Sequence, residues 1–326
     1  MNRVFAVTSA LTLGLAVFAR GAAGGSSTGI ITEYAIPTAH ALSGGLAVGS
    51  DGNVWFTEDA GNKIAMITTS GKITEYAIPT GSASPEDIAA GPDGSLWFTE
   101  TQANKIGRIG TRGSFTEYAI PTRGAWPYGI AAGPDGNLWF TENRANKIGK
   151  ITPRGAITEY KIPSARANST DIAAGRDGNL WFNESSGPGP NDSKIGKITT
   201  GGTITEYLLS TRGAEPIDIA AGPDGNLWFT ENDSDRIAKF DPSGMITEYP
   251  IPTRNARPYG ITAGPDGNLW FNESKGNKIA KITTNGAITE YALPTAGAGL
   301  DGITAGSDGK LWFAENYGNK IGTISP

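Results

Sequence analysis

A tryptophan that recurs at an almost constant interval constrains the fold of this chain more than any other feature. It begins a repeated W-F-x-E phrase, and its seven copies are Trp55, Trp97, Trp139, Trp181, Trp228, Trp270 and Trp312. Successive copies are 42 residues apart, except for one interval of 47 between the fourth and the fifth. A repeat of this length without a long helical pattern is typical of a β-propeller blade, which consists of four short strands and their turns. The sequence therefore predicts an all-β, seven-bladed β-propeller with four antiparallel strands in each blade.

The third copy shows how one blade is built. Residues 128–133 form a small-residue strand A, which a Pro-Asp-Gly-Asn turn joins to strand B at 138–142. Strand C at 147–152 and strand D at 156–163 both alternate between apolar and polar residues. The glycine and alanine of strand A suit the crowded central channel, and the proline that closes strand D suits an outer edge.

The ends of the repeat predict how the ring closes. Residues 30–37 read as a strand D that no strand A, B or C precedes, and Lys320–Ile324 read as a strand C that no strand D follows. The N-terminal strand should therefore complete the seventh blade and cover its open edge. The predicted blades are 38–79, 80–121, 122–163, 164–210, 211–252, 253–294 and 295–326 plus 30–37. The five extra residues of blade 4 fall within 185–193, in its B–C loop.

The N-terminus predicts export. A single positive charge at Arg3 precedes the apolar stretch 4–19, and small residues follow at 21–23. This pattern is typical of a secretory signal peptide at 1–23, which leaves 24–326 as one propeller domain. An uncleaved membrane anchor is the alternative, but the apolar run is shorter than the roughly 20 residues of a spanning helix. We therefore expect a secreted or periplasmic protein that is not membrane-bound after cleavage.

Composition narrows the possible partners. The net charge of -5 and the pI near 5.1 offer no basic surface for nucleic acid. The chain has no cysteine, and therefore no disulfide, thiol nucleophile or thiolate metal site. We expect a monomer whose ligand is a small molecule, a glycan or a peptide.

The up-and-down order of the strands assigns the loops to two faces. The D–A connections and the B–C loops share one face, which we call the D–A face. The A–B turns and the C–D turns share the other, which we call the A–B face. The A–B face repeats almost unchanged between copies, which indicates a structural role, so we look for function on the D–A face.

The glutamate of the W-F-x-E phrase is identical in all seven copies. These residues are Glu58, Glu100, Glu142, Glu184, Glu231, Glu273 and Glu315. One interpretation is a ring of carboxylates that binds a hard cation such as Mg²⁺ or Ca²⁺. The other, which the identity of the copies favours, is structural: each glutamate accepts hydrogen bonds from its own B–C loop or pairs with a lysine such as Lys63, Lys105 or Lys147.

Two positions before or at the start of strand A differ from blade to blade. The first series is Gly44, Glu86, Tyr128, Thr170, Ile217, Tyr259 and Asp301, and the second, two residues earlier, is Leu42, Ser84, Trp126, Asn168, Glu215, Arg257 and Gly299. Aromatic rings and a few converging polar groups at a concave mouth are typical of a ligand site. The predicted ligand-binding residues are Trp126, Tyr128, Glu215, Arg257 and Tyr259, with Arg212 and Arg254 from the D–A connections. A solvent-filled rim without function is the alternative.

The recurring phrases resemble those of the streptogramin B lyase (virginiamycin B lyase) family over residues 30–326. The matching phrases are I-T-E-Y-x-I-P, G-I-x-A-G-P-D-G-N-L-W-F-T-E and N-K-I-G-K-I-T. The resemblance implies a seven-bladed propeller and a Mg²⁺-dependent elimination that opens cyclic streptogramin B antibiotics at an ester bond. It also implies two glutamates on the metal, a histidine base in a Glu-Pro-His-Gly-Ile phrase, and a second histidine in an Asn-Ala-Arg-Pro-His phrase one blade away.

Transferred to this chain, the family motif lacks its histidines. The metal pair becomes Glu215 and Glu231, whereas Ile217 stands in place of the base. The Asn-Ala-Arg-Pro phrase ends in Tyr259 instead of histidine, and the two phrases follow one another in the reverse order. The only histidine of the chain is His40, which lies outside these motifs, near the first D–A connection.

These observations support three functional hypotheses. The first is a lyase-like propeller that has lost streptogramin elimination and binds its ligand at the D–A face. The second is an active Mg²⁺-dependent carbon–oxygen lyase, or a hydrolase, with a base other than histidine. Its candidates are Glu86, Tyr128, Tyr259 and Asp301. A tyrosine base would need a strongly lowered pKa and a carboxyl base a raised one. The third hypothesis is a scaffold that binds another protein.

Overall fold

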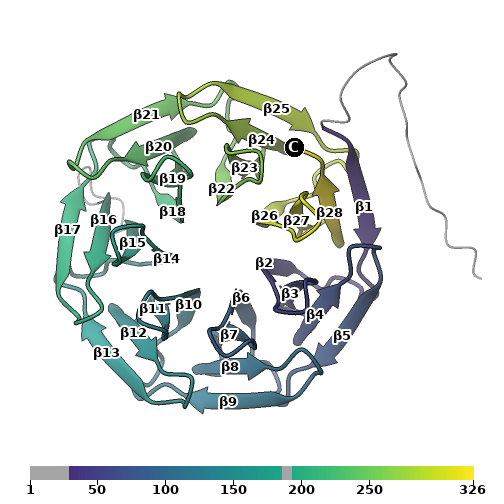
Figure 1. The fold of residues 1–326 in the computed structure, drawn as a ribbon, viewed down its shortest axis with the longest axis vertical. Helices are drawn as coiled ribbons and strands as arrows, with labels where there is room; N and C mark the ends of the chain where they lie inside the picture. Colours follow the sequence, from purple (N-terminus) through teal and green to yellow (C-terminus); the bar gives the residue numbers. More distant parts are fainter. Residues whose placement is uncertain (1–28, 186–192) are drawn as a thin grey trace, which may run out of the picture.

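The protein is a ring of seven four-stranded antiparallel sheets around a central channel (Figure 1). This computed structural model describes residues 29–185 and 193–326. The predicted fold class is confirmed. The predicted signal peptide 1–23 lies outside the described residues, as does most of the blade 4 insertion, which connects β15 to β16.

Each sheet is one blade, and the strands follow one another from the channel outward as A, B, C and D (Figure 1). Blade 1 comprises β2 (Ser43–Val48), β3 (Val54–Glu58), β4 (Lys63–Ile67) and β5 (Ile73–Ala77). Blade 2 comprises β6 (Pro85–Ala90), β7 (Leu96–Glu100), β8 (Lys105–Ile109) and β9 (Phe115–Ala119). Blade 3 comprises β10 (Pro127–Ala132), β11 (Leu138–Glu142), β12 (Lys147–Ile151) and β13 (Ile157–Lys161). Blade 4 comprises β14 (Ile172–Ala174), β15 (Leu180–Ser185), β16 (Ser193–Ile198) and β17 (Ile204–Leu208).

The remaining blades repeat the pattern. Blade 5 comprises β18 (Pro216–Ala221), β19 (Leu227–Glu231), β20 (Arg236–Phe240) and β21 (Ile246–Pro250). Blade 6 comprises β22 (Pro258–Ala263), β23 (Leu269–Glu273), β24 (Lys278–Ile282) and β25 (Ile288–Ala292). Blade 7 comprises β26 (Leu300–Ala305), β27 (Leu311–Glu315), β28 (Lys320–Ile324) and the N-terminal β1 (Ile31–Ala35). None of the described residues forms a helix long and apolar enough to cross a membrane.

The N-terminal strand closes the ring as the sequence predicts. β1 pairs antiparallel with β28, in a register that places Ile31 opposite Ile324 and Ala35 opposite Lys320. The side chain of Glu33 adds a 2.6 Å ion pair with Lys320 and a 2.8 Å hydrogen bond from the hydroxyl of Thr295. The two ends of the chain therefore share one sheet.

The hydrophobic core lies between neighbouring blades. One cluster combines Trp55 and Ile64 of blade 1 with Ile88 and Phe98 of blade 2, and equivalent clusters follow around the ring. Six of the seven repeated tryptophans are 0% exposed, because each lies between two sheets. Their indole nitrogens donate to the aspartate of the preceding A–B turn, as from Trp139 to Asp135 at 3.0 Å. The blades are thus held by burial of aromatic area and by one satisfied indole donor per blade.

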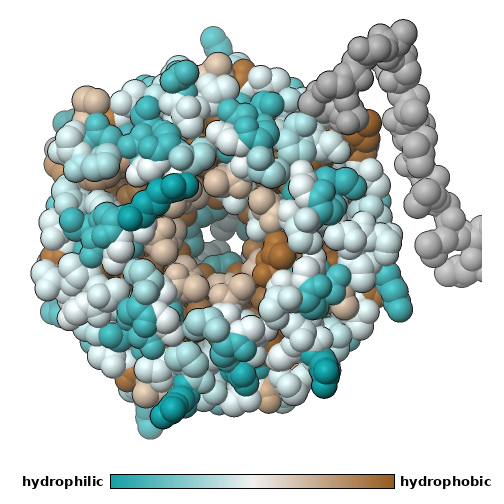
Figure 2. Space-filling view, in the orientation of Figure 1, coloured by the Kyte–Doolittle hydropathy of each residue, from teal (hydrophilic) through white to brown (hydrophobic). Residues whose placement is uncertain are grey.

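The connections of the D–A face are fastened to the B–C loops. In blade 2, the backbone N–H of Thr101 donates to the carbonyl of Ser84 at 3.0 Å. The residues equivalent to Ser84 adopt a positive φ in every blade, a conformation that is uncommon for residues other than glycine. Figure 2 shows the opening at the centre of the ring, with apolar residues around it and the more polar side chains toward the perimeter.

The repeated lysines do not pair with the W-F-x-E glutamates, so that prediction is wrong. Lys147 instead forms a 3.0 Å ion pair with Glu159 of strand D and donates to Thr122 at 2.6 Å. Lys63 and Lys105 pair in the same way with the strand D glutamates of their own blades. Strand C has strand B on one side and strand D on the other, and the structure places the ammonium group of Lys147 on the strand D glutamate.

Candidate functional site

The variable positions at the start of strand A converge on one cavity of about 310 Å³ in the central channel. Six of the seven line it, and these are Glu86, Tyr128, Thr170, Ile217, Tyr259 and Asp301. The ring places them there because each strand A is the innermost strand of its blade. All four residues considered as a catalytic base therefore lie in one space.

Two tyrosines meet across this cavity. The hydroxyl oxygens of Tyr128 in blade 3 and Tyr259 in blade 6 are 3.3 Å apart and share a hydrogen bond. Burial raises the pKa of Tyr128, and the charge of Asp301 together with burial raises the pKa of Tyr259. Both shifts run opposite to what a tyrosine base needs at neutral pH, because they make the hydroxyl harder to ionise.

The two candidate carboxyl groups are shifted in the direction that a base requires. Burial, with repulsion from Asp59 and Asp301, raises the pKa of Glu86 to about 8. Burial raises the pKa of Asp301 to about 6, although a 3.3 Å hydrogen bond from the amide of Asn316 opposes the shift. Both groups therefore exchange a proton close to neutral pH.

A second set of channel residues, which the sequence analysis missed, follows the first by one position. Three blades place an aspartate there, and these are Asp87, Asp171 and Asp218. Each carboxylate accepts a backbone N–H from a neighbouring blade; the donors are Ile130 at 2.8 Å, Ile219 at 3.0 Å and Ile261 at 2.7 Å. Comparing the copies at this position, where the other four blades have glycine, was the available signal.

The glycines of this position make room for the aspartates. A Cβ placed on Gly129 would lie 2.7 Å from the Cα of Asp171 and 2.9 Å from its Oδ1. Asp171 and Asp218 occupy neighbouring blades, so burial and mutual repulsion raise the pKa of Asp171 well above its usual range. Burial and repulsion from Asp171 raise the pKa of Asp87 to about 8. The described lining of the cavity thus holds five carboxyl groups and no lysine, arginine or histidine.

The other predicted ligand-binding residues lie outside this cavity, on the D–A face. The guanidinium group of Arg257 is 3.6 Å from the carboxylate of Glu215, forms an ion pair with Asp233, and donates to Asn232 at 2.9 Å. Arg212 and Arg254 are exposed on the D–A connections and do not line the cavity. They are separated from the tyrosines that the sequence grouped with them.

Trp126 carries its own cationic partner. The guanidinium carbon of Arg144, from the B–C loop of the same blade, lies 3.5 Å from the centre of the Trp126 ring. This cation–π stacking covers one face of the Trp126 indole.

The glutamates of the W-F-x-E phrase are all 0% exposed. In six blades neither carboxyl oxygen has a hydrogen-bond partner in the protein, and in blade 5 only Oε2 of Glu231 accepts a bond, from Ser234 at 3.0 Å. The expected hydrogen bonds from the B–C loops are therefore absent for six of the seven described glutamates. Burial, with repulsion from the strand D glutamate of each blade, raises their pKa values to about 7 or 8.

Comparison with known proteins identifies the family. The sequence profile of the virginiamycin B lyase family matches residues 23–189 and 188–326. The chain belongs to the virginiamycin B lyase family. A streptogramin B lyase structure is 40% identical, with a TM-score of 0.85, over 90% of this chain and 97% of the other.

Two structures of the lyase from Staphylococcus aureus match equally well. The selenomethionine form is 40% identical, with a TM-score of 0.85, over 91% of this chain and 99% of the other. The second is a histidine-to-alanine variant, described as catalytically inactive and bound to quinupristin; it is 41% identical, with the same TM-score and coverage. A comparison with curated protein sequences finds no match.

The residues that stand at the family's metal position do not fit a magnesium ion in this arrangement. Glu215 and Glu231 belong to one blade, where Pro216 pairs with Glu231 in the sheet. Glu231 is buried, however, whereas Glu215 is partly exposed beside the guanidinium group of Arg257. A fixed positive charge there competes with a divalent cation. No group of three or more His, Asp or Glu side chains among the described residues is arranged to hold a metal.

The one histidine does not replace the family base. His40 is exposed on the first D–A connection and does not line the channel cavity. The position in which the resemblance expects a base holds Ile217, which contributes only an apolar side chain to the cavity.

Proposed function

We propose that this chain is an exported ligand-binding propeller of the virginiamycin B lyase family that does not catalyse streptogramin elimination. One observation carries the proposal: no imidazole lines the cavity in the described residues, and Ile217 stands where the family resemblance expects the base. Abstraction of a proton next to a carbonyl depends on a base that is free at neutral pH, and loss of such a base typically costs about 10²–10⁴-fold in rate.

The lining of the cavity supports a ligand that carries a positive charge. The five carboxyl groups of the channel face no basic side chain among the described lining residues. The rings of Tyr128 and Tyr259 add flat apolar area on which an ammonium group binds well. We therefore propose a small molecule, amino sugar or short peptide with a protonated amine as the ligand.

Incubation with quinupristin tests the loss of the lyase activity. Purified protein with Mg²⁺ should open the ring no faster than buffer does, as followed by liquid chromatography and mass spectrometry. The lyase from Staphylococcus aureus serves as the positive control. Mg²⁺-dependent opening that Glu215→Gln abolishes would contradict the proposal.

A second candidate function follows from the two shifted carboxyl groups. The pKa values of Glu86 and Asp301, about 8 and 6, suit a carboxylate base in a lyase or hydrolase that acts on a different substrate. Turnover of a panel of esters and lactones, lost in Glu86→Gln or Asp301→Asn, would favour this candidate. The absence of any turnover that depends on these two side chains would exclude it.

Matched amine–alcohol pairs test the charge of the ligand. Benzylamine and glucosamine should show saturable binding by ligand-observed NMR, whereas benzyl alcohol and glucose should not. The double variant Glu86→Gln/Asp301→Asn should weaken the amines about tenfold, because neither side chain can then ionise against a bound ammonium group. Equal binding of the alcohols would show that the acidic lining does not select the ligand.

A further inference from the structure

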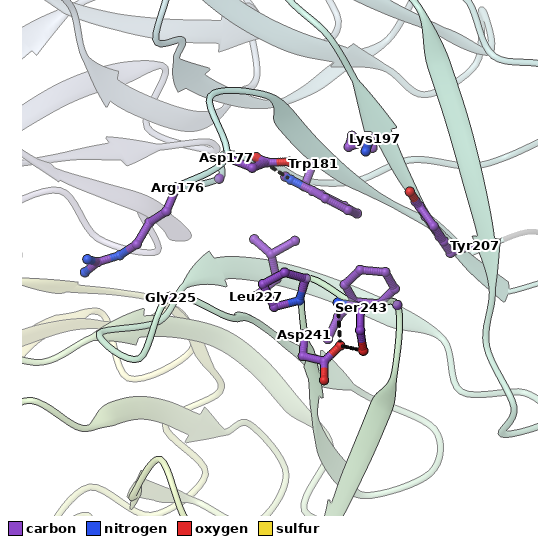
Figure 3. A pocket seen from close by; sticks show the side chains of 13 residues that line it. Arg176, Asp177, Trp181, Lys197, Tyr207, Gly225, Leu227, Asp241 and Ser243 are labelled. Carbon is purple, nitrogen blue, oxygen red and sulfur yellow. Dashed lines mark hydrogen bonds between the residues drawn. The ribbon is translucent and has the colours of Figure 1, made fainter.

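A pocket of about 180 Å³ lies between blades 4 and 5 on the A–B face, away from the channel cavity (Figure 3). Its wall consists of Trp181 and Tyr207 from blade 4 and Leu227 and Phe240 from blade 5. This face repeats almost unchanged in sequence, and the pocket is a local departure from that repetition.

At six of the seven blade interfaces, a tyrosine packs against a glycine in the position that this pocket occupies between blades 4 and 5. In each, a strand D tyrosine lies against the glycine that precedes or ends the C–D turn of the next blade. A Cβ placed on Gly155, for example, would come within 2.1 Å of the Tyr118 ring. At the interface of blades 4 and 5 the corresponding glycine is Gly244, and no heavy atom of the neighbouring blade lies within 4 Å of its Cβ position. The turn therefore stands away from Tyr207.

Phe240 explains why this interface is open. The other six blades have isoleucine at this position. The Phe240 ring lies 5.0 Å from the Tyr207 ring and 5.2 Å from the Trp181 ring, and so takes the place in which tyrosine would meet glycine. Trp181 and Tyr207 are inclined by 28°, compared with 11–18° for the other tryptophan–tyrosine pairs. Trp181 is also 6% exposed, whereas the other repeated tryptophans are 0% exposed.

The ammonium group of Lys197 lies over two of these rings, in a pocket that the carboxylates of Asp177 and Asp241 also line. The ammonium nitrogen of Lys197 lies 5.4 Å from the centre of the Trp181 ring and 5.9 Å from that of Tyr207. The equivalent lysine of blade 5, Lys239, donates to the carbonyl of Thr284 in the next turn at 3.3 Å. Among the described residues, Lys197 forms neither such a hydrogen bond nor an ion pair, and the turn that would supply the carbonyl has no neighbour within 4 Å at Gly244.

The aspartates of the pocket are already engaged. Asp177 accepts the indole N–H of Trp181 at 3.1 Å and two bonds from Asn179. Asp241 accepts bonds from Ser243 and from the backbone of Met245 within its own turn. Figure 3 shows the side chain of Arg176 extending away from the rings, which leaves Lys197 as the cation beside them.

We propose that this pocket binds a small aromatic carboxylate, with its ring among Trp181, Tyr207 and Phe240 and its carboxylate on the ammonium group of Lys197. The size is suitable, since an engineered cavity of about 150 Å³ holds benzene. Aromatic walls recognise a planar ring, and a lysine without a hydrogen-bonding partner gains one from an anion. The site is independent of the ligand at the channel mouth, where the lining is acidic.

Fluorine NMR with 4-fluorobenzoate tests this assignment. The full chain should bind the probe saturably, with a dissociation constant on the order of a millimolar for so small a ligand. Lys197→Met should weaken binding by about tenfold or more, because it removes the charge-assisted contact. Lys239→Met is the matched control and should leave binding unchanged, since Lys239 stands at the same position of the next blade. Phe240→Ile, which restores the residue of the other blades, should also weaken binding.

Two comparison probes decide the charge and the location. Neutral 4-fluorobenzyl alcohol should bind more weakly to the wild type than the carboxylate does, and should not distinguish it from Lys197→Met. Circular dichroism verifies that each variant is folded. The proposal is overturned by a lack of saturable binding of 4-fluorobenzoate, by equal binding of the alcohol, or by equal losses in Lys197→Met and Lys239→Met.

Discussion

The buried glutamate at the end of strand B should make the stability of this ring fall as pH rises. In blade 3, Glu142 is 0% exposed and neither of its carboxyl oxygens has a hydrogen-bond partner in the protein. Burial, with repulsion from Glu159, raises its pKa from the ordinary value of 4.5 to about 8. We expect Glu142→Gln to stabilise the protein at neutral and alkaline pH, because the amide has a similar shape and no charge.

The magnitude follows from linkage between protonation and folding. Between pH 4.5 and pH 8 the folded state binds more protons at Glu142 than the unfolded state, so the free energy of unfolding decreases as pH rises. One pKa unit corresponds to about 1.4 kcal/mol, and pH 7 lies about 2.5 units above the unfolded pKa, so holding the proton on the buried group costs up to about 3 kcal/mol of stability. Below pH 4.5 the carboxyl is protonated in both states and the cost disappears. The stabilisation by Glu142→Gln should therefore be about 1 kcal/mol at pH 5 and up to about 3 kcal/mol at pH 7.

Urea unfolding followed by tryptophan fluorescence at pH 5, 6, 7 and 8 measures this difference. Glu159→Gln is the control within the same blade: although burial opposes it, hydrogen bonds from Lys147 and Thr122 lower the pKa of Glu159. That substitution should destabilise the protein at pH 7 and do so less as pH falls through the lowered pKa. A stability difference for Glu142→Gln that is the same at pH 5 and pH 8 would refute the reasoning.

One deletion and two substitutions test the contacts that hold the ring together. Removing residues 29–36 uncovers the edge of β28 and should lower the melting temperature and promote aggregation in size-exclusion chromatography, and a synthetic peptide of that segment should restore the monomer. Asn146→Ala should cost about 2–4 kcal/mol in urea unfolding, since it removes hydrogen bonds to Ala167 and Ile162 at a residue with φ of 56°; no measurable loss would contradict this. Arg257→Met should cost less than about 1 kcal/mol, because its ion pairs are partly exposed, and the loss should vanish in high salt.

The fold could be predicted almost completely, because seven similar copies leave one architecture that satisfies all of them. The pairing of β1 with β28 followed from the incomplete ends alone, since a lone strand D and a missing strand D have only one way to combine. The sequence could not locate the partner of the repeated lysines. Strand C has a strand on either side, and a periodic pattern does not say whether Lys147 reaches Glu142 or Glu159.

The candidate site was predictable in position but not in composition. Variation between copies identified Tyr128 and Tyr259, and the ring brought their hydroxyl groups to 3.3 Å because blades 3 and 6 lie across the channel from each other. Asp87 and its two counterparts were missed because the other four blades have glycine at the same position. In a single copy, that glycine is interpreted as a turn or an irregularity of the strand. The pKa values of these groups depend on burial from several blades at once, and no single repeat contains that information.

Phe240 shows that the repeated face also carries information, and a stability measurement can separate its two explanations. If the phenylalanine were only a packing defect, Phe240→Ile should stabilise the protein by restoring the contact between Tyr207 and Gly244, with no loss elsewhere. If the open interface is a binding site, the same substitution should stabilise the free protein but remove the stabilisation by 4-fluorobenzoate, because the ligand and the closed turn compete for one space. If Phe240→Ile raises the melting temperature and 4-fluorobenzoate still raises the melting temperature of that variant further, the probe binds elsewhere. Phe240 would then have no role in binding.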